Sequence, residues 1–180
     1  MNSLKEAKIF FASGQLEKSI EYFTLAENEG DDIVDVCLSR GAAAMALGRY
    51  AAAEKDFTRV LIEDEENERA HYFRGVALVA LGKYEKAIND LTFSLIKNNN
   101  RGIAHLARGL AYSELGNEKD AALDFNTASA FSDAELQSFK KLFGDIPSPF
   151  SNSKAMLAKE NAPWNNLLSI ENAKKLSDLL

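Results

Sequence analysis

The chain has 180 residues, of which 46% are hydrophobic and 27% are charged, a composition typical of a soluble globular domain. The formal net charge of −6 and the pI near 5.1 argue against a nucleic-acid-binding surface, which needs a basic stripe. No apolar run approaches the roughly 18 residues of a membrane span. The first residues do not resemble a secretory signal, and a single cysteine, Cys37, fits a reducing compartment, so we expect a cytoplasmic protein.

A period of about 34 residues organises the chain as far as residue 135. Shifting the sequence by this period superposes glycines at two phases without insertion or deletion. One phase holds Gly41, Gly75 and Gly109, and the other holds Gly14, Gly48, Gly82 and Gly116. A fixed period of about 20 to 50 residues is typical of a solenoid. The sequence therefore predicts four helical hairpins, over residues 1–33, 34–67, 68–101 and 102–135.

The expected helices follow the repeats in order. They cover about residues 3–12 and 17–28, 35–46 and 51–63, and 103–114 and 118–131, and the third repeat reads as two helices around Gly82. One more helix, 132–143, is expected to close the open end of the solenoid. A turn-rich linker then leads to an amphipathic helical tail. We therefore divide the chain into a repeat domain, 1–144, and a linker with tail, 145–180.

The two glycine phases have different expected roles. A mid-helix glycine such as Gly75 costs about 1 kcal/mol relative to alanine, which suggests that the next helix approaches it closely. A glycine that follows a helix, such as Gly82, suits positive φ. Large apolar residues recur on the second helix of each repeat and are expected to fill the space between repeats: Phe23, Phe57, Leu91 and Phe125.

A charged pair recurs as well. Arg40, Arg74 and Arg108 are each followed, at one constant spacing along the chain, by an aspartate, namely Asp56, Asp90 and Asp124. We predict that each pair joins the two helices of one repeat. If the pairs are partly exposed, each contributes at most about 1 kcal/mol. The alternative is an arginine ladder that faces an acidic ligand.

These residues resemble the tetratricopeptide repeat family, which has Gly at repeat positions 8 and 15, Tyr at 17, Ala at 20 and an aromatic residue at 24. The second and third repeats match best, and the family's proline near the repeat end is absent throughout. The resemblance implies an all-α, right-handed superhelical solenoid of four hairpins with a capping helix and a helical tail. It also implies a non-enzymatic module whose first helices line a concave groove.

Mapping the family's groove onto this chain gives a mainly apolar wall. Its expected partner-binding residues are Leu4, Lys8, Phe11, Leu38, Ala42, Met45, Arg69, Tyr72, Phe73, Val76, Val79, Leu106 and Leu110. Relatives that hold acidic chaperone tails use a Lys/Asn/Asn/Lys/Arg set, of which at most Arg69 is retained here in kind. We therefore expect a protein or peptide partner with an apolar or amphipathic helical segment.

The tail offers a second cover for this wall. Trp164, Leu167 and Leu168 are large apolar residues beyond the linker and have no core of their own. We expect the tail to dock on the solenoid, in the groove or on the convex side. Docking in the groove would make the tail compete with partners.

The sequence predicts no catalytic site and no cofactor-binding site. Cys37, His71 and His105 share one repeat position, but equivalent residues of successive repeats lie too far apart to converge on one metal ion. We expect no metal, no cofactor and no enzyme activity. The leading function is an adaptor or co-chaperone-like interaction module, similar to small acidic tetratricopeptide chaperones. The alternative is a self-assembling structural scaffold subunit.

Overall fold

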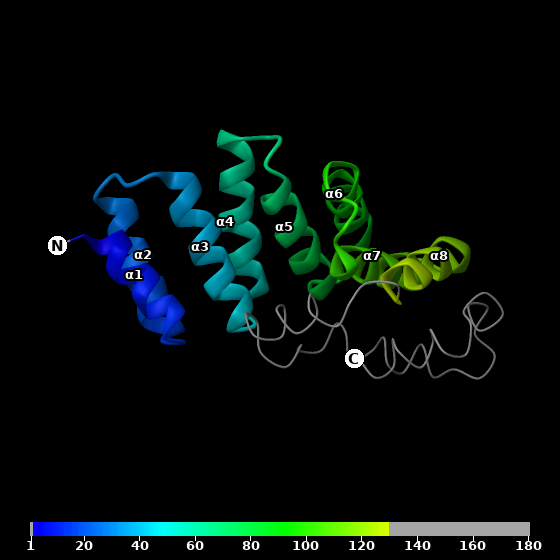
Figure 1. The fold of residues 1–180 in the computed structure, drawn as a ribbon, viewed down its shortest axis with the longest axis horizontal. Helices are drawn as coiled ribbons and strands as arrows, with labels where there is room; N and C mark the ends of the chain where they lie inside the picture. The colour runs from blue at the N-terminus through cyan, green and yellow to red at the C-terminus, as the bar shows by residue number, and fades with distance from the viewer. Residues whose placement is uncertain (1, 130–180) are drawn as a thin grey trace.

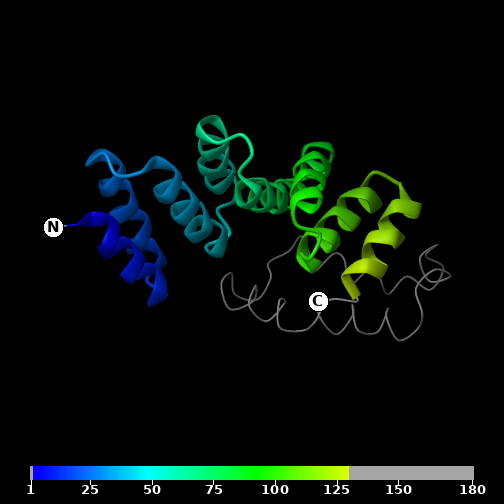
Figure 2. The ribbon, with the colours of Figure 1, turned by 45° about the horizontal axis from the view of Figure 1, so that its top comes forward.

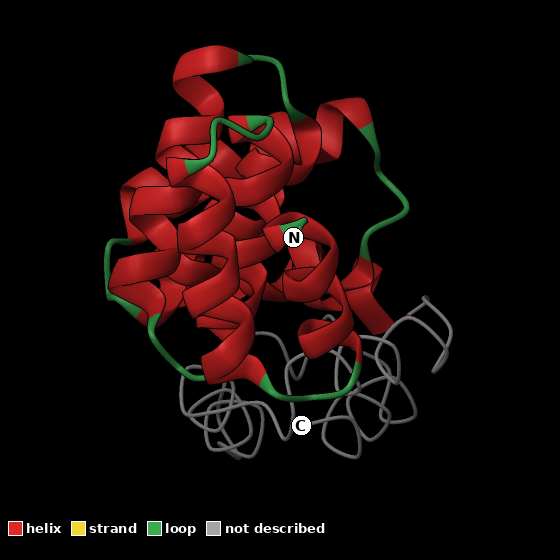
Figure 3. Ribbon diagram, turned by 90° about the vertical axis from the view of Figure 1, so that its left-hand side faces the viewer, coloured by secondary structure: helices red, strands yellow, loops and turns green. Residues whose placement is uncertain are grey.

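The computed structural model describes residues 2–129, which form eight α-helices and no strand (Figures 1 and 3). The helices are α1 (Ser3–Ala12), α2 (Leu16–Asn28), α3 (Ile33–Ala46), α4 (Tyr50–Glu63), α5 (Glu68–Ala80), α6 (Tyr84–Lys97), α7 (Gly102–Glu114) and α8 (Glu118–Ser129). Consecutive helices pack as hairpins, and each hairpin packs on the next through α2–α3, α4–α5 and α6–α7. The hairpins follow one another along the long axis (Figures 1 and 2). The predicted all-α helical repeat is confirmed.

The first helices of three repeats begin at a polar side chain that caps the backbone. Asn2, Asp32 and Asn67 each accept a hydrogen bond from the backbone N–H three residues later, at 2.8 to 3.0 Å. Such a cap satisfies one of the N–H groups that the first turn leaves without a partner. The cap at Asp32 explains why α3 begins at Ile33, two residues before the predicted start.

The glycines between the two helices of each hairpin have the positive φ that the sequence predicts. Gly14, Gly48, Gly82 and Gly116 have φ of 76°, 71°, 70° and 76°. The left-handed conformation lets the chain reverse, and the residue after each glycine donates back into the helix that has just ended. In the third repeat the Lys83 N–H donates to the Leu78 carbonyl at 2.9 Å. This pattern satisfies carbonyl groups at the end of the helix.

The mid-helix glycines permit the predicted close approach of the two helices in a hairpin. A Cβ atom added to Gly75 would lie 2.6 Å from Leu91 Cγ, and one added to Gly41 would lie 2.7 Å from Phe57 Cε1. Leu91 and Phe57 are fully buried. These large residues therefore pack against the glycine of their own hairpin. Phe57 also contacts the next repeat, because its ring stacks on that of Phe73 with ring centres 5.6 Å apart.

Replacing this glycine tests the close approach directly. Gly75→Ala should lower the free energy of unfolding by about 1 to 2 kcal/mol, because the overlap with Leu91 outweighs the higher helix propensity of alanine. Urea unfolding followed by circular dichroism measures the change. Adding Leu91→Ala should make the double variant less costly than the sum of the two single changes. A Gly75→Ala chain more stable than the wild type would contradict the close approach.

The three predicted arginine–aspartate pairs are present, and each is bidentate. Arg74 Nε and Nη2 donate to Asp90 at 2.6 and 2.8 Å, and the pairs Arg40–Asp56 and Arg108–Asp124 have the same two contacts at 2.7 to 2.9 Å. The aspartates are buried, with at most 7% of the residue exposed. Because the fork of each guanidinium already holds a carboxylate, the arginines tie the two helices of a hairpin together.

Candidate partner-binding surface

The predicted wall residues lie on the first helices of the four repeats, α1, α3, α5 and α7, and the structure divides them by exposure. Leu4, Phe11, Leu38, Phe73 and Ala42 are partly exposed, and Lys8 and Arg69 are exposed. Met45, Tyr72, Val76, Val79, Leu106 and Leu110 are buried, with at most 4% exposed. The accessible part of the wall therefore belongs mainly to the first two repeats.

The accessible part combines apolar side chains with one ion pair that links two repeats. Leu4 and Phe11 of α1 pack against the small core of the first hairpin, and Leu38 of α3 packs against two neighbouring clusters. Lys8 Nζ lies 2.5 Å from Asp35 Oδ2 and joins α1 to α3 across this surface. Both partners are about half exposed, so the pair contributes little stability and leaves the apolar residues beside it in contact with water.

The part on α5 and α7 belongs to the largest buried cluster. Tyr72, Val76 and Leu106 lie in one cluster with residues of α4, α6 and α8. Helix α5 packs on α7 more extensively than α1 packs on α3 or α3 on α5. Phe73 turns toward α4 and stacks on Phe57, so it packs between repeats and contributes less to an open wall than the sequence suggested.

A charged group lies beside Tyr72 where the third repeat ends. The Arg101 Cζ atom lies 4.3 Å from the centre of the Tyr72 ring, and Arg101 also donates to both Glu68 oxygens, at 2.6 and 2.7 Å. Ser94 donates to the same carboxylate at 2.6 Å. Burial alone would raise the pKa of the Glu68 carboxyl group, but the hydrogen bonds from Arg101 and Ser94 outweigh it and lower the pKa below its ordinary value of 4.5.

This lowered pKa predicts a pH dependence of stability. The unfolded chain binds the Glu68 proton more tightly than the folded chain, so the stabilisation is present above about pH 4.5 and is lost as the pH falls through the folded pKa. Urea midpoints measured between about pH 5 and about pH 3 should fall less steeply for Glu68→Gln than for the wild type. Equal slopes for the two chains would show that Glu68 contributes nothing to the acid sensitivity.

Cys37, His71 and His105 lie apart and have separate partners. His71 Nδ1 and His105 Nδ1 lie 2.8 Å from Asp90 Oδ1 and Asp124 Oδ1, so in these two repeats the histidine supports the aspartate of the arginine pair. Cys37 Sγ instead accepts from Arg40 Nη2 at 3.9 Å. Burial raises the pKa of the Cys37 thiol to about 11. Residues 2–129 contain no group of three or more His, Cys, Asp or Glu side chains arranged to hold a metal ion. In the same range no helix is both long and apolar enough to cross a membrane.

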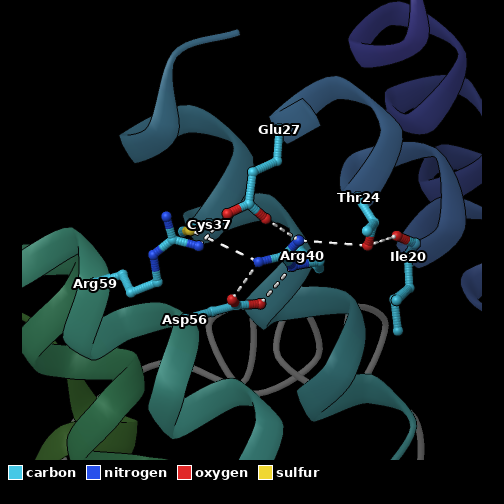
Figure 4. Close-up of polar contacts among 7 residues, drawn as sticks. All are labelled: Ile20, Thr24, Glu27, Cys37, Arg40, Asp56 and Arg59. Carbon is cyan, nitrogen blue, oxygen red and sulfur yellow. Dashed lines mark hydrogen bonds and ion pairs between the residues drawn. The ribbon is translucent and has the colours of Figure 1, made fainter. Parts of the chain in front are cut away.

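Sequence reasoning missed a third member of the arginine pairs. Arg40, Arg74 and Arg108 also donate through Nη1 to a threonine of the preceding repeat, namely Thr24, Thr58 and Thr92, at 3.1 to 3.4 Å. The threonines recur with the period of the repeat, so the signal was present in the sequence. Each arginine thereby joins the second helix of one repeat to both helices of the next. Figure 4 shows this arrangement for Arg40.

The remaining predicted features lie outside the described residues. These are the closing helix 132–143, the linker, and the tail residues Trp164, Leu167 and Leu168. The docking of the tail and the boundary of the repeat domain at residue 144 therefore stay predictions.

Stacked helical hairpins with an apolar surface along their first helices define a class of protein: a helical-repeat protein–protein interaction module. Comparison with family models identifies the family. The tetratricopeptide repeat model matches residues 38–91 and 79–135, which together cover more than half of the chain. The chain belongs to the tetratricopeptide repeat family. Members of this family are generally non-enzymatic interaction modules.

Solved structures share this fold at low sequence identity. MamA from Desulfovibrio magneticus RS-1 is 18% identical, with a TM-score of 0.70, and the match covers 98% of this chain and 92% of that one. MamA MSR-1 is 16% identical with a TM-score of 0.67, covering 98% and 94%. YrrB, a tetratricopeptide repeat protein with an unusual peptide-binding site, is 15% identical with a TM-score of 0.64, covering 82% and 71%. No curated protein sequence matches significantly.

Proposed function

We propose that this chain is an adaptor or co-chaperone-like module that binds an apolar or amphipathic helical segment of a partner protein on the surface formed by α1 and α3. The observation that supports this proposal is the run of partly exposed apolar side chains from Leu4 and Phe11 to Leu38 and Ala42. Apolar area that stays in contact with water is a source of binding energy when a partner covers it. The fold shared with YrrB, a protein with a peptide-binding site, is in keeping with a peptide partner.

The remaining wall residues are assigned to the same partner in this proposal. Arg69 is exposed and would contact an acidic group of the partner, whereas Tyr72, Val76 and Leu110 would contact it only after a rearrangement that uncovers them. Residues 145–180 would regulate binding by competing with the partner through Trp164, Leu167 and Leu168. Trp164→Ala with Leu168→Ala in the full chain should then raise the affinity for a captured partner. Equal or lower affinity would contradict this regulation.

The proposal is tested by capturing partners with the full chain and with two matched variants of α1. Phe11→Asp places a charge on the proposed surface, whereas Ile9→Asp changes a residue of the same helix that is 54% exposed and lies outside the proposed set. A partner that is captured from native lysate should be lost with Phe11→Asp and retained with Ile9→Asp, with both variants showing wild-type circular dichroism. Loss of the partner with both variants, or with neither, would contradict the assignment of the site.

Self-assembly is the alternative outcome of the same experiment. Light scattering across a concentration series measures whether the mass of the purified chain rises with protein concentration. If the mass rises and Phe11→Asp abolishes the rise, a second copy of the chain occupies the proposed surface in place of a different partner.

A further inference from the structure

The three interfaces between successive repeats contain the same set of hydrogen-bonded polar residues, which we call the polar frame. Each frame contains a threonine from the preceding repeat, an arginine, and an aspartate, in the order Thr24–Arg40–Asp56, Thr58–Arg74–Asp90 and Thr92–Arg108–Asp124. Differences in the residues around the frame therefore show what each interface adds. The second interface, between α4 and α5, differs from the first at two positions beside this frame.

At the first interface an ion pair occupies the space beside the frame (Figure 4). Glu27 of α2 accepts hydrogen bonds from Arg59 of α4 and from Arg40 of α3, the latter at 2.6 Å. Both hydrogen bonds lower the pKa of the Glu27 carboxyl group, the one from Arg59 most strongly. The two side chains of this pair belong to successive repeats, so the pair spans the gap between the second helices α2 and α4.

At the second interface the same two positions are apolar. Leu61 and Phe93 stand one repeat period after Glu27 and Arg59. Arg74 Nη1 therefore has no carboxylate here that corresponds to Glu27, and it donates to Thr58 at 3.3 Å. A shallow pocket of about 500 Å³ lies here, and we call it the Phe93 pocket. It is lined by Thr58, Leu61, Ile62, Glu65, Glu66, His71, Arg74 and Phe93. This volume lies within the range of about 300–1,000 Å³ that is usual for ligand sites.

The Phe93 pocket is separate from the proposed surface on α1 and α3. It shares no residue with the predicted wall, and on α5 its Arg74 lies nearly opposite Tyr72 and Val76 around the helix. At its edge Ile62 is 74% exposed, although it is a large apolar residue. The pocket therefore offers apolar area in contact with water on a second side of the solenoid.

The charges around the pocket favour a ligand that carries a positive charge next to its apolar group. The positive charge of Arg74 is matched by Asp90, which accepts two hydrogen bonds from it. Glu66 forms an ion pair with Lys97 at 2.9 Å, and the same Lys97 Nζ lies 5.5 Å from the centre of the Phe93 ring. The His71 ring also packs on Phe93, with ring centres 4.1 Å apart. Within the described residues the Glu65 carboxylate has no ion-pair or hydrogen-bond partner, and it lies on the loop between α4 and α5 at the top of Figure 1. The net charge around the apolar walls is therefore negative.

We propose that the Phe93 pocket binds a large apolar side chain of a partner polypeptide that carries a lysine or arginine next to it. The apolar side chain packs on Leu61, Ile62 and Phe93, and the adjacent cation lies over Glu65. The third interface lacks both features, because Thr127 stands where Phe93 does and Asn99 and Asn100 replace the two glutamates. The second repeat interface thus carries a binding site that the first and third interfaces lack.

Chemical-shift perturbation of the isotope-labelled full chain tests this proposal with three blocked tripeptides: Lys-Phe-Lys, Glu-Phe-Glu and Lys-Ser-Lys. We expect Lys-Phe-Lys to shift the amide signals of Ile62, Glu65 and Phe93 saturably. The other two peptides should bind at least about tenfold more weakly, because one lacks the cations and the other lacks the apolar side chain. Lack of saturable shifts with Lys-Phe-Lys would overturn the proposal.

The key variant combines Leu61→Glu with Phe93→Arg, which copies the ion pair of the first interface into the second. Because the first interface folds with this pair, the variant should keep the wild-type circular dichroism and bind Lys-Phe-Lys at least about tenfold more weakly. Ile62→Arg changes an exposed residue and should weaken binding as well. Ile9→Asp, which changes a residue of α1 that is 54% exposed, should leave the binding unchanged. Unchanged binding in both pocket variants, or an equal loss with Ile9→Asp, would overturn the assignment.

Discussion

Phe57→Ala is expected to lower the free energy of unfolding by about 3 to 5 kcal/mol, more than the loss of the Arg74–Asp90 ion pair. The Phe57 ring is fully buried, lies against Gly41 of its own hairpin and stacks on Phe73 of the next. Removing it therefore leaves a cavity at a place where two hairpins meet. Urea unfolding followed by circular dichroism measures the loss.

Two further variants show whether the cavity causes this loss. Ile62→Ala changes a residue of the same helix that is 74% exposed, and its effect should stay within about 0.5 kcal/mol. Phe57→Leu should cost much less than Phe57→Ala, because Leu91 fills the equivalent place against Gly75. A Phe57→Ala chain that loses less than about 1 kcal/mol would mean that the neighbouring side chains collapse into the space.

Asp90→Ala is expected to lower the free energy of unfolding by about 2 to 4 kcal/mol. Removing one partner of a buried ion pair usually costs about 3 to 5 kcal/mol, and we expect somewhat less because 22% of the Arg74 side chain is exposed. Asp90 accepts hydrogen bonds from Arg74 at 2.6 and 2.8 Å and also contacts His71, so its removal leaves two groups of α5 without their partner on α6. The measurement is again the urea unfolding curve.

The control for this prediction is an exposed ion pair between neighbouring repeats. Lys83 donates to Glu54, and 45% of the Lys83 side chain is exposed, so Lys83→Ala should cost at most about 1 kcal/mol. Replacing both partners of the buried pair, with Arg74→Met and Asp90→Leu, should recover part of the loss, because no charge is then left unpaired. If Asp90→Ala and Lys83→Ala cost the same, the arginine–aspartate pairs do not hold the hairpins together.

The two sets of contacts have different consequences for a solenoid. Among residues 2–129 the hairpins that hold Phe57 and Asp90 pack mainly on their neighbours along the row, so each change weakens its own repeat and the adjacent interface most. The partner surface proposed on α1 and α3 lies at the N-terminal end of this row, and the Phe93 pocket lies in its middle. Leu38 packs against the same buried cluster as Leu61 of the pocket, so variants of α1 are the ones that can be tested with little effect on the pocket.

Much of the fold could be predicted from the sequence, because the features that specify it are local and recur at one fixed period. Glycine recurs at the position of Gly82 because the chain reverses there with positive φ. It recurs at the position of Gly75 because a large residue of the next helix lies against the helix backbone there. The arginine–aspartate pairs followed from a constant spacing within one hairpin. These contacts are made inside a repeat, so the spacing along the chain is enough to place them.

Only the tertiary structure decided which surfaces are accessible. The sequence assigned Leu38 and Val76 to the same apolar wall, but Leu38 is partly exposed and Val76 is 2% exposed, in a part of the solenoid where α5 and α7 pack closely. The Phe93 pocket could not be predicted from the sequence either, because Leu61 and Phe93 come together only when two repeats stack. A period in the sequence specifies which side chains recur, whereas their exposure depends on how closely neighbouring repeats pack, and that depends on all the side chains between them.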